Sequence, residues 1–152
     1  PSEQFMADVQ AGYSFPLGPA TTPTTAPMIY MFADPLCPHC KDMIRMLDPA
    51  LTRGDIQVRV LLVGALAPDS APLASGIISQ KDPGAALREF MNGTGNFKKG
   101  DPNNAKIAEN LGILTKWKFD GTPVTTYRAK DGTIKLLQGP PKSLDILLQD
   151  LR

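Results

Sequence analysis

The sequence predicts an α/β fold with a β-α-β half, a helical insertion and a β-β-α half. Three observations lead to this prediction. Two apolar runs, at residues 28–33 and 56–63, flank an amphipathic helical pattern. A largely helical stretch then covers about residues 65–118. Two short β-type runs and a final amphipathic pattern complete the chain, which has 152 residues and is long enough for one domain with its own core.

The first half is predicted from continuous and periodic apolar residues. Residues 28–33 form an uninterrupted apolar run that is typical of a buried strand, and residues 37–51 have helical periodicity. Residues 56–63 alternate at first and then become continuously apolar, as expected of a central strand. Because a helix connects the two strands, we expect them to be parallel.

The segment before this half is predicted to be an N-terminal helix and linker arm, residues 1–27. Residues 2–10 can form a short helix, whereas residues 12–27 are rich in Pro, Thr, Gly and Ala. This composition is typical of an extended linker or a surface arm. An irregular stretch packed on the domain is the alternative. The main domain is expected to span residues 28–152.

The insertion and the second half are predicted from periodicity and turn signals. Three helices are expected in the insertion, at residues 71–80, 83–91 and 103–116. Residues 124–128 and 133–137 form a predicted hairpin around Asp131 and Gly132. Residues 144–151 carry leucines at helical spacing and predict a C-terminal helix.

Composition argues against some classes of partner. The net charge is +1, which gives no reason to propose nucleic acid or an anionic membrane as partner. No apolar run approaches the ~20 residues that a membrane span needs. The chain starts at Pro1 without a visible signal peptide, so a mature secreted protein, a cytosolic protein and an excised fragment all stay open.

The two cysteines of the chain, Cys37 and Cys40, lie between the strand at 28–33 and the helix that follows. A Cys-x-x-Cys at a strand-to-helix junction is the layout of a thiol–disulfide active site. A thiolate at Cys37 is favoured by the helix N-terminus, by His39 and by Pro38, whose φ suits a first turn. Cys40 shares a stripe with core residues, so we expect an exposed attacking Cys37 and a sheltered resolving Cys40.

Simpler interpretations of the motif are a structural disulfide, a zinc site and two unrelated buried thiols. A Cys-x-x-Cys bridge closes a very short loop and adds little stability in the chain-entropy model. A zinc site needs about four ligands. The chain offers two Cys and one His, so a mononuclear site would need carboxylates or a second chain. We therefore expect no metal and no cofactor.

A second motif, Gly121-Thr122-Pro123-Val124, opens the predicted hairpin. A proline at the first residue of a strand donates no N–H and belongs at the start or edge of a sheet. In thioredoxin-like proteins a cis-proline at this place packs beside the active-site cysteines. By that resemblance Pro123 is the candidate cis-proline and the backbone of Thr122 would pair with a substrate strand. An ordinary trans turn proline is the alternative.

Three segments together resemble the catalytic domain of the DsbC/DsbG family of periplasmic disulfide isomerases, its DsbG members most closely. They are residues 32–41, 60–64 and 121–124. The resemblance runs from about residue 28 to the end, and it implies a thioredoxin-like fold with a helical insertion between the β-α-β and β-β-α halves. It also implies a periplasmic location.

The resemblance further implies a thiol–disulfide oxidoreductase of the isomerase or reductase type. The Cys37 thiolate would attack a disulfide or a sulfenic acid of a client protein, and Cys40 would resolve the mixed disulfide. Thr122 and Pro123 would form the substrate-facing loop. A membrane reductase of the DsbD type would keep the cysteines reduced.

His39 departs from the family, whose isomerases commonly have Tyr at this position. Cys-Pro-His-Cys is instead the motif of the DsbA oxidases. A His there stabilises the thiolate and makes the disulfide more oxidising. A DsbA-like dithiol oxidase with a DsbB-like partner is therefore an alternative. A chaperone-like module that binds peptides around Thr122 and Pro123 is an alternative from another class.

Two further departures concern the N-terminus and a buried acid. The family's isomerases carry a dimerisation domain before a linker helix, and residues 2–10 could be that helix alone. Thioredoxins have a buried Asp six residues before the first Cys, where this chain has Met31. Asp34 could assist the motif in its place, and a surface turn residue before Pro35 is the equal alternative.

Overall fold

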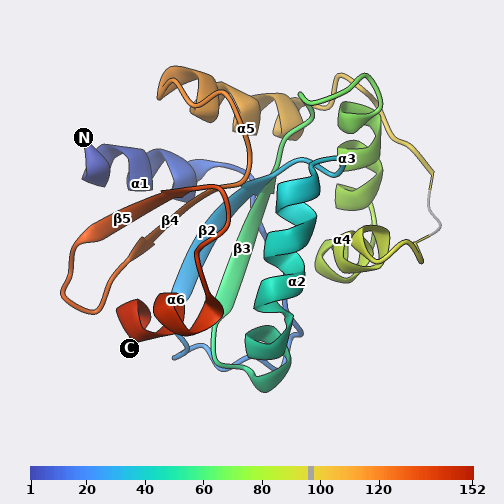
Figure 1. The fold of residues 1–152 in the computed structure, drawn as a ribbon. Coiled ribbons are helices and arrows are strands. Elements are labelled where there is room, and N and C mark those ends of the chain that lie inside the picture. Colours follow the sequence, from blue (N-terminus) through green and yellow to red (C-terminus); the bar gives the residue numbers. More distant parts are fainter. Residues whose placement is uncertain (96–97) are drawn as a thin grey trace.

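The structure is a computed structural model that describes residues 1–95 and 98–152. Residues 96 and 97, within the predicted insertion, lie outside the described residues. A five-stranded sheet has the order β1-β3-β2-β4-β5 (Figure 1). Strands β2 and β3 are parallel, as predicted, and the pairs β1–β3, β2–β4 and β4–β5 are antiparallel. Among the described residues no helix is long and apolar enough to cross a membrane.

The elements confirm the predicted order. The strands are β1 (Phe15–Pro16), β2 (Met28–Ala33), β3 (Gln57–Leu62), β4 (Val124–Arg128) and β5 (Ile134–Gln138). The helices are α1 (Ser2–Ala11), α2 (Pro38–Arg53), α3 (Ser70–Ile78), α4 (Pro83–Met91), α5 (Ala105–Lys116) and α6 (Leu144–Leu151). Every predicted strand and helix is present, with ends shifted by at most a few residues. Strand β1 was not predicted.

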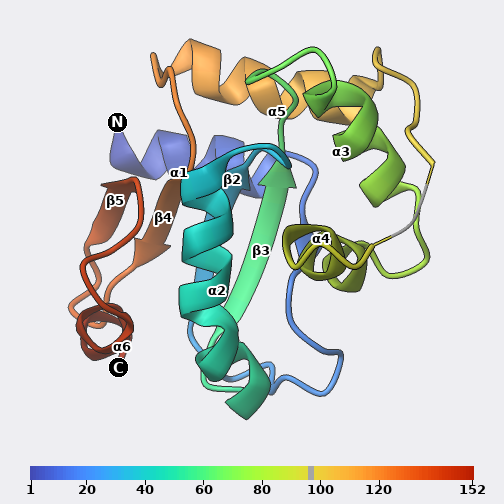
Figure 2. The same ribbon diagram turned by 45° about the vertical axis from the view of Figure 1, so that its right-hand side comes forward.

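Helices cover both faces of the sheet. Helix α2 lies along one face, and α1 lies on the other (Figures 1 and 2). Successive side chains of β2 point to opposite faces of the sheet. Met31 belongs to the core cluster that contains Leu47 of α2, whereas Phe32 belongs to the cluster that contains Phe5 of α1. The core therefore has two layers, and the end of β2 between them leads into the cysteine motif.

The segment after α1 packs against the domain. Phe15 and Leu17 are buried, and β1 pairs with β3. Arg88 of α4 donates through Nε to the Leu17 carbonyl at 2.9 Å. At Gly84 a Cβ would lie 2.2 Å from the Pro16 carbonyl oxygen, so glycine is required for this approach. The packed alternative thus describes residues 12–17, whereas residues 19–25 are mostly exposed, as a surface arm would be. A domain boundary between residues 27 and 28 stays a prediction.

Candidate active site

Helix α2 places the sulfur of Cys37 at its N-terminus. Cys37 is the N-cap residue, with extended φ and ψ of −83° and 115°, and Pro38 occupies the first turn. The backbone N–H of Cys40 donates to Cys37 Sγ at 3.2 Å, which is the bond that a Ser or Asp oxygen makes at other helix N-caps. The sulfur therefore lies where the helix offers partial positive charge.

The two thiols differ in burial, but less than predicted. Cys37 has 4% of its surface exposed and Cys40 has none. The expectation of an openly exposed Cys37 is thus wrong, because the loops before α2 and β4 pack around it. Cys37 nevertheless lines two surface clefts, and Cys40 lines neither. Burial, followed by the hydrogen bond with Cys37, raises the pKa of the Cys40 thiol. The two cysteines are unbridged in the structure.

The second motif lies beside the first, as the sequence predicted. The peptide bond between Thr122 and Pro123 is cis. Cys37 Sγ donates to the Thr122 carbonyl oxygen at 3.4 Å, although the two residues are 85 positions apart in the chain. Pairing of Phe32 with Val124 brings them together, because Phe32 precedes the cysteine loop and Val124 follows Pro123.

Asp34 is buried, with 1% exposure, so the alternative of a surface turn residue is wrong. Its Oδ1 accepts from Leu36 N–H at 3.0 Å, and its Oδ2 accepts from the N–H groups of Ala65 and Leu66, both at 2.9 Å. The carboxylate therefore joins the cysteine loop to the loop after β3.

His39 is exposed at the rim of the same region. Its ring makes no hydrogen bond or ion pair within the part of the chain that the structure describes. A hydrogen bond from His39 to Cys37 Sγ is thus absent there, and a role in stabilising the thiolate stays a prediction. Among the same residues, no group of three or more His, Cys, Asp or Glu side chains gathers to hold a metal.

A cleft of about 480 Å³ extends from Cys37 to α5. Its apolar lining comes partly from the insertion and includes Leu66, which is 58% exposed, Leu111 and Phe119. This apolar lining was not predicted from the sequence. The leucine spacing on the predicted helix at 103–116 was a signal, but periodicity alone does not separate a core face from the wall of a cleft. A second cleft of about 360 Å³ also reaches Cys37, and its lining includes Phe90 and Met91 of α4.

Comparison with known proteins supports the resemblance to DsbG that the sequence motifs indicated. The thiol:disulfide interchange protein DsbG of Escherichia coli (strain K12) is 32% identical over 129 residues, which cover 80% of this chain and 52% of that protein. The chain is similar to DsbG over most of its own length. DsbG of Pseudomonas aeruginosa is 26% identical to this domain over 122 residues, 76% of the chain and 47% of that protein. The domain spans about half the length of the curated relatives it matches. No family model matches it.

Solved structures share the fold of this DsbG-like domain. The catalytic domain of Proteus mirabilis ScsC aligns with a TM-score of 0.71 at 19% identity, over 97% of this chain and 96% of that one. A disulfide interchange protein from Neisseria gonorrhoeae aligns with a TM-score of 0.66 at 23% identity, over 82% of this chain and 87% of that one. At these identities the likeness extends to the thioredoxin-like fold alone.

Proposed function

We propose that the protein is a thiol–disulfide oxidoreductase that acts on client proteins as a disulfide isomerase or reductase. The observation that carries this proposal is the geometry at Cys37. Its sulfur is capped by the Cys40 N–H at 3.2 Å, lies 3.4 Å from the Thr122 carbonyl oxygen, and lines a cleft open to solvent. A resolving thiol, Cys40, lies directly behind it.

The proposed reaction begins when the Cys37 thiolate attacks one sulfur of a client disulfide. The client S–S bond breaks, a mixed disulfide forms, and the leaving client sulfur takes a proton. In reduction, Cys40 loses its proton and attacks Cys37 Sγ. This step releases the client thiol and leaves a Cys37–Cys40 disulfide. In isomerisation, a second client thiolate attacks instead, and the enzyme returns unchanged.

The same first step reduces a client sulfenic acid. The Cys37 thiolate attacks the oxidised sulfur, the S–O bond breaks and the oxygen leaves as water after protonation. The mixed disulfide that remains is resolved by Cys40. Burial raises the pKa of Cys40, so this residue stays a thiol until the attack, and a base or solvent must take its proton at that moment.

Client binding is assigned to the backbone of Thr122 and to the adjacent cleft. An extended client chain would pair with the backbone of Thr122, directly before β4, and the apolar lining would accept its side chains. The further parts of the proposal are a periplasmic location and a DsbD-like membrane reductase as electron donor. The resemblance to DsbG supports both.

The test is turnover of a disulfide-containing peptide by the wild-type protein and two variants. Cys37→Ser is expected to lose activity by several orders of magnitude, because the nucleophile is gone. Cys40→Ser is expected to accumulate a mixed disulfide that mass spectrometry detects. Unchanged activity of Cys37→Ser would contradict the proposal. Protection of unfolded chains from aggregation that persists without both cysteines would favour a chaperone-like module instead.

A dithiol oxidase is the second candidate, and His39 at the rim of the cleft is the observation that favours it. The redox equilibrium of the cysteine pair with glutathione, measured by thiol alkylation and mass, addresses it. A potential near about −120 mV would place the protein with the strongly oxidising members. A value near roughly −270 mV would indicate a thioredoxin-like reductant and would remove His39 as a strong stabiliser of the thiolate.

A further inference from the structure

The segment that joins α5 to Pro123 carries the proposed client-binding backbone. We call residues 117–122 the substrate loop. Phe119, Gly121 and Thr122 of this loop line the larger cleft beside Cys37. Placement of the Thr122 carbonyl oxygen relative to Cys37 Sγ therefore depends on what holds the substrate loop.

Aromatic contacts connect the loop to the N-terminal helix. The Phe5 ring of α1 lies 5.7 Å from the Trp117 ring, edge to face, and 5.5 Å from the Phe119 ring, measured between centroids. Phe5 is buried and does not line the cleft, whereas Phe119 does. Phe5 thus supports the cleft wall from the interior of the protein.

A carboxylate on α1 holds the start of the loop. Asp8 Oδ2 accepts from Trp117 Nε1 at 2.8 Å and from Lys116 Nζ at 2.7 Å. The hydrogen bond to Lys116 lowers the pKa of Asp8, so the carboxylate stays charged over the neutral range. The contacts of Phe5 and Asp8 therefore fall on Trp117 and Phe119, which lie on either side of a turn at the end of α5.

The residue at this turn has a left-handed backbone conformation. Lys118, between Trp117 and Phe119, has a φ of 61°. A lysine does not favour this conformation, so neighbouring contacts have to select it. From α1, Asp8 accepts the hydrogen bond of Trp117 before Lys118, and the Phe5 ring contacts Phe119 after it.

We propose that α1 is a positioning element for client binding. Through Phe5 and Asp8 it sets the placement of the substrate loop, and with it the Thr122 backbone against which a client chain pairs. This inference rests on the proposed function and adds a determinant of client affinity outside the cysteine motif. The reaction with a small disulfide that cannot pair with the Thr122 backbone should not depend on the placement of the substrate loop.

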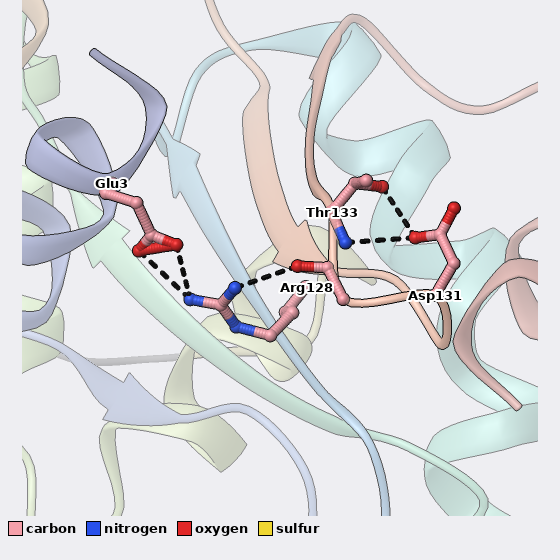
Figure 3. Close-up of polar contacts among 5 residues, drawn as sticks. Glu3, Arg128, Asp131 and Thr133 are labelled. Atoms are coloured by element: carbon pink, nitrogen blue, oxygen red, sulfur yellow. Dashed lines mark hydrogen bonds and ion pairs between the residues drawn. The ribbon is translucent and has the colours of Figure 1, made fainter.

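The experiment compares Asp8→Ala with Glu3→Gln in the full 152-residue chain. Glu3 is a matched control because it also lies on α1, but its carboxylate oxygens accept from Arg128 Nη2 at 2.9 and 3.1 Å, at the hairpin end of β4 (Figure 3). With reduced glutathione as the electron donor, each protein reduces a disulfide-containing peptide and, separately, hydroxyethyl disulfide, which has no peptide backbone. Unfolding midpoints are measured alongside.

Asp8→Ala is expected to raise KM for the peptide about threefold to tenfold, with kcat and the rate with hydroxyethyl disulfide unchanged. Glu3→Gln is expected to leave all three constants unchanged. If Asp8→Ala does not fold, Phe5→Leu is measured in its place with the same expectation.

An unchanged peptide KM in both Asp8→Ala and Phe5→Leu would overturn the inference. Equal losses with both substrates, or the same rise in KM in Glu3→Gln, would also overturn it, because they indicate general loosening of the helix. A wild-type protein that shows no Cys37-dependent reaction with either disulfide would contradict the proposed function itself, and the inference with it.

Discussion

Asp34 shows how one side chain organises the surroundings of Cys37. Its carboxylate is the common acceptor for N–H groups of two loops that are about 30 residues apart in the chain. One of these loops carries Cys37 and the other carries Leu66, which lines the cleft. Since a buried N–H without a partner is costly, the carboxylate stabilises the relative placement of Cys37 and the cleft wall.

Replacing Asp34 should therefore destabilise the protein in a graded way. Asp34→Ala leaves three backbone N–H groups without this acceptor and is expected to lower the free energy of unfolding by about 3 kcal/mol. Asp34→Asn keeps one acceptor oxygen and should lose about half as much. Urea denaturation measures both. Asp42→Asn, at an exposed position of α2, is the control and should be neutral. Equal stability of Asp34→Ala and wild type would contradict this role.

At the scale of elements, the end of α5 decides how the chain approaches the active site. Lys118 N–H bonds to the Thr115 carbonyl at 3.1 Å, and Phe119 N–H bonds to the Leu114 carbonyl at 2.9 Å. This is a Schellman pattern, in which the left-handed position is usually a glycine. Here it is Lys118, which is exposed and has a φ of 61°. The helix thus ends with a strained residue that lies within the substrate loop.

Lys118→Gly should relieve this strain. Glycine adopts the left-handed region freely but gains entropy in the unfolded state, so the expected net change is a stabilisation of about 0.5–1 kcal/mol. Lys118→Val should destabilise by about 1 kcal/mol or more, because a β-branched residue disfavours this backbone. Lys118→Ala controls for loss of the side chain alone. Thermal or urea unfolding ranks the three variants, and a glycine variant less stable than the alanine variant would contradict the argument.

At the scale of the whole molecule, both terminal helices hold the strand that leaves the active site. β4 starts directly after Pro123. Its last residue, Arg128, is bonded to Glu3 of α1, and the Tyr127 hydroxyl donates to Asp150 of α6 at 2.7 Å. The two helices contribute to different core clusters, on opposite faces of the sheet. Anchoring of β4 is therefore a property of the complete domain.

The bond between Tyr127 and Asp150 predicts a dependence of stability on alkaline pH. Burial, and then the hydrogen bond to Asp150, raises the pKa of Tyr127 above its ordinary value of 10.0. The stability from a group with a raised pKa is fully present below the ordinary value and is lost as the pH rises through the raised value. Tyr127→Phe should cost about 1–2 kcal/mol at neutral pH, and the difference from wild type should shrink above about pH 10.

Urea denaturation between about pH 7 and pH 11 measures this difference. Tyr30→Phe is the control, since the Tyr30 hydroxyl is on β2 and makes no hydrogen bond within the described chain. A difference between Tyr127→Phe and wild type that stays constant over the whole range would show that the phenol does not contribute through its pKa.

The order of elements could be predicted from sequence because hydrophobic periodicity is local. Runs such as 28–33 reveal strands, and leucine spacing reveals helices, without knowledge of what they contact. The cysteine motif was equally local, and resemblance to thioredoxin-like proteins added the cis bond before Pro123. The sequence by itself therefore determined the fold class, and it predicted the nucleophile and its resolving partner.

Only the tertiary structure decided how the surroundings of Cys37 are built. The N–H partners of Asp34, the pairing of β1 and the apolar lining of the cleft each involve residues from separate segments. Composition around residues 12–27 indicated a linker, because Pro and Gly predict irregular backbone but not whether it is buried. Burial and hydrogen-bond partners depend on contacts across the chain, and a pattern within one segment does not contain them.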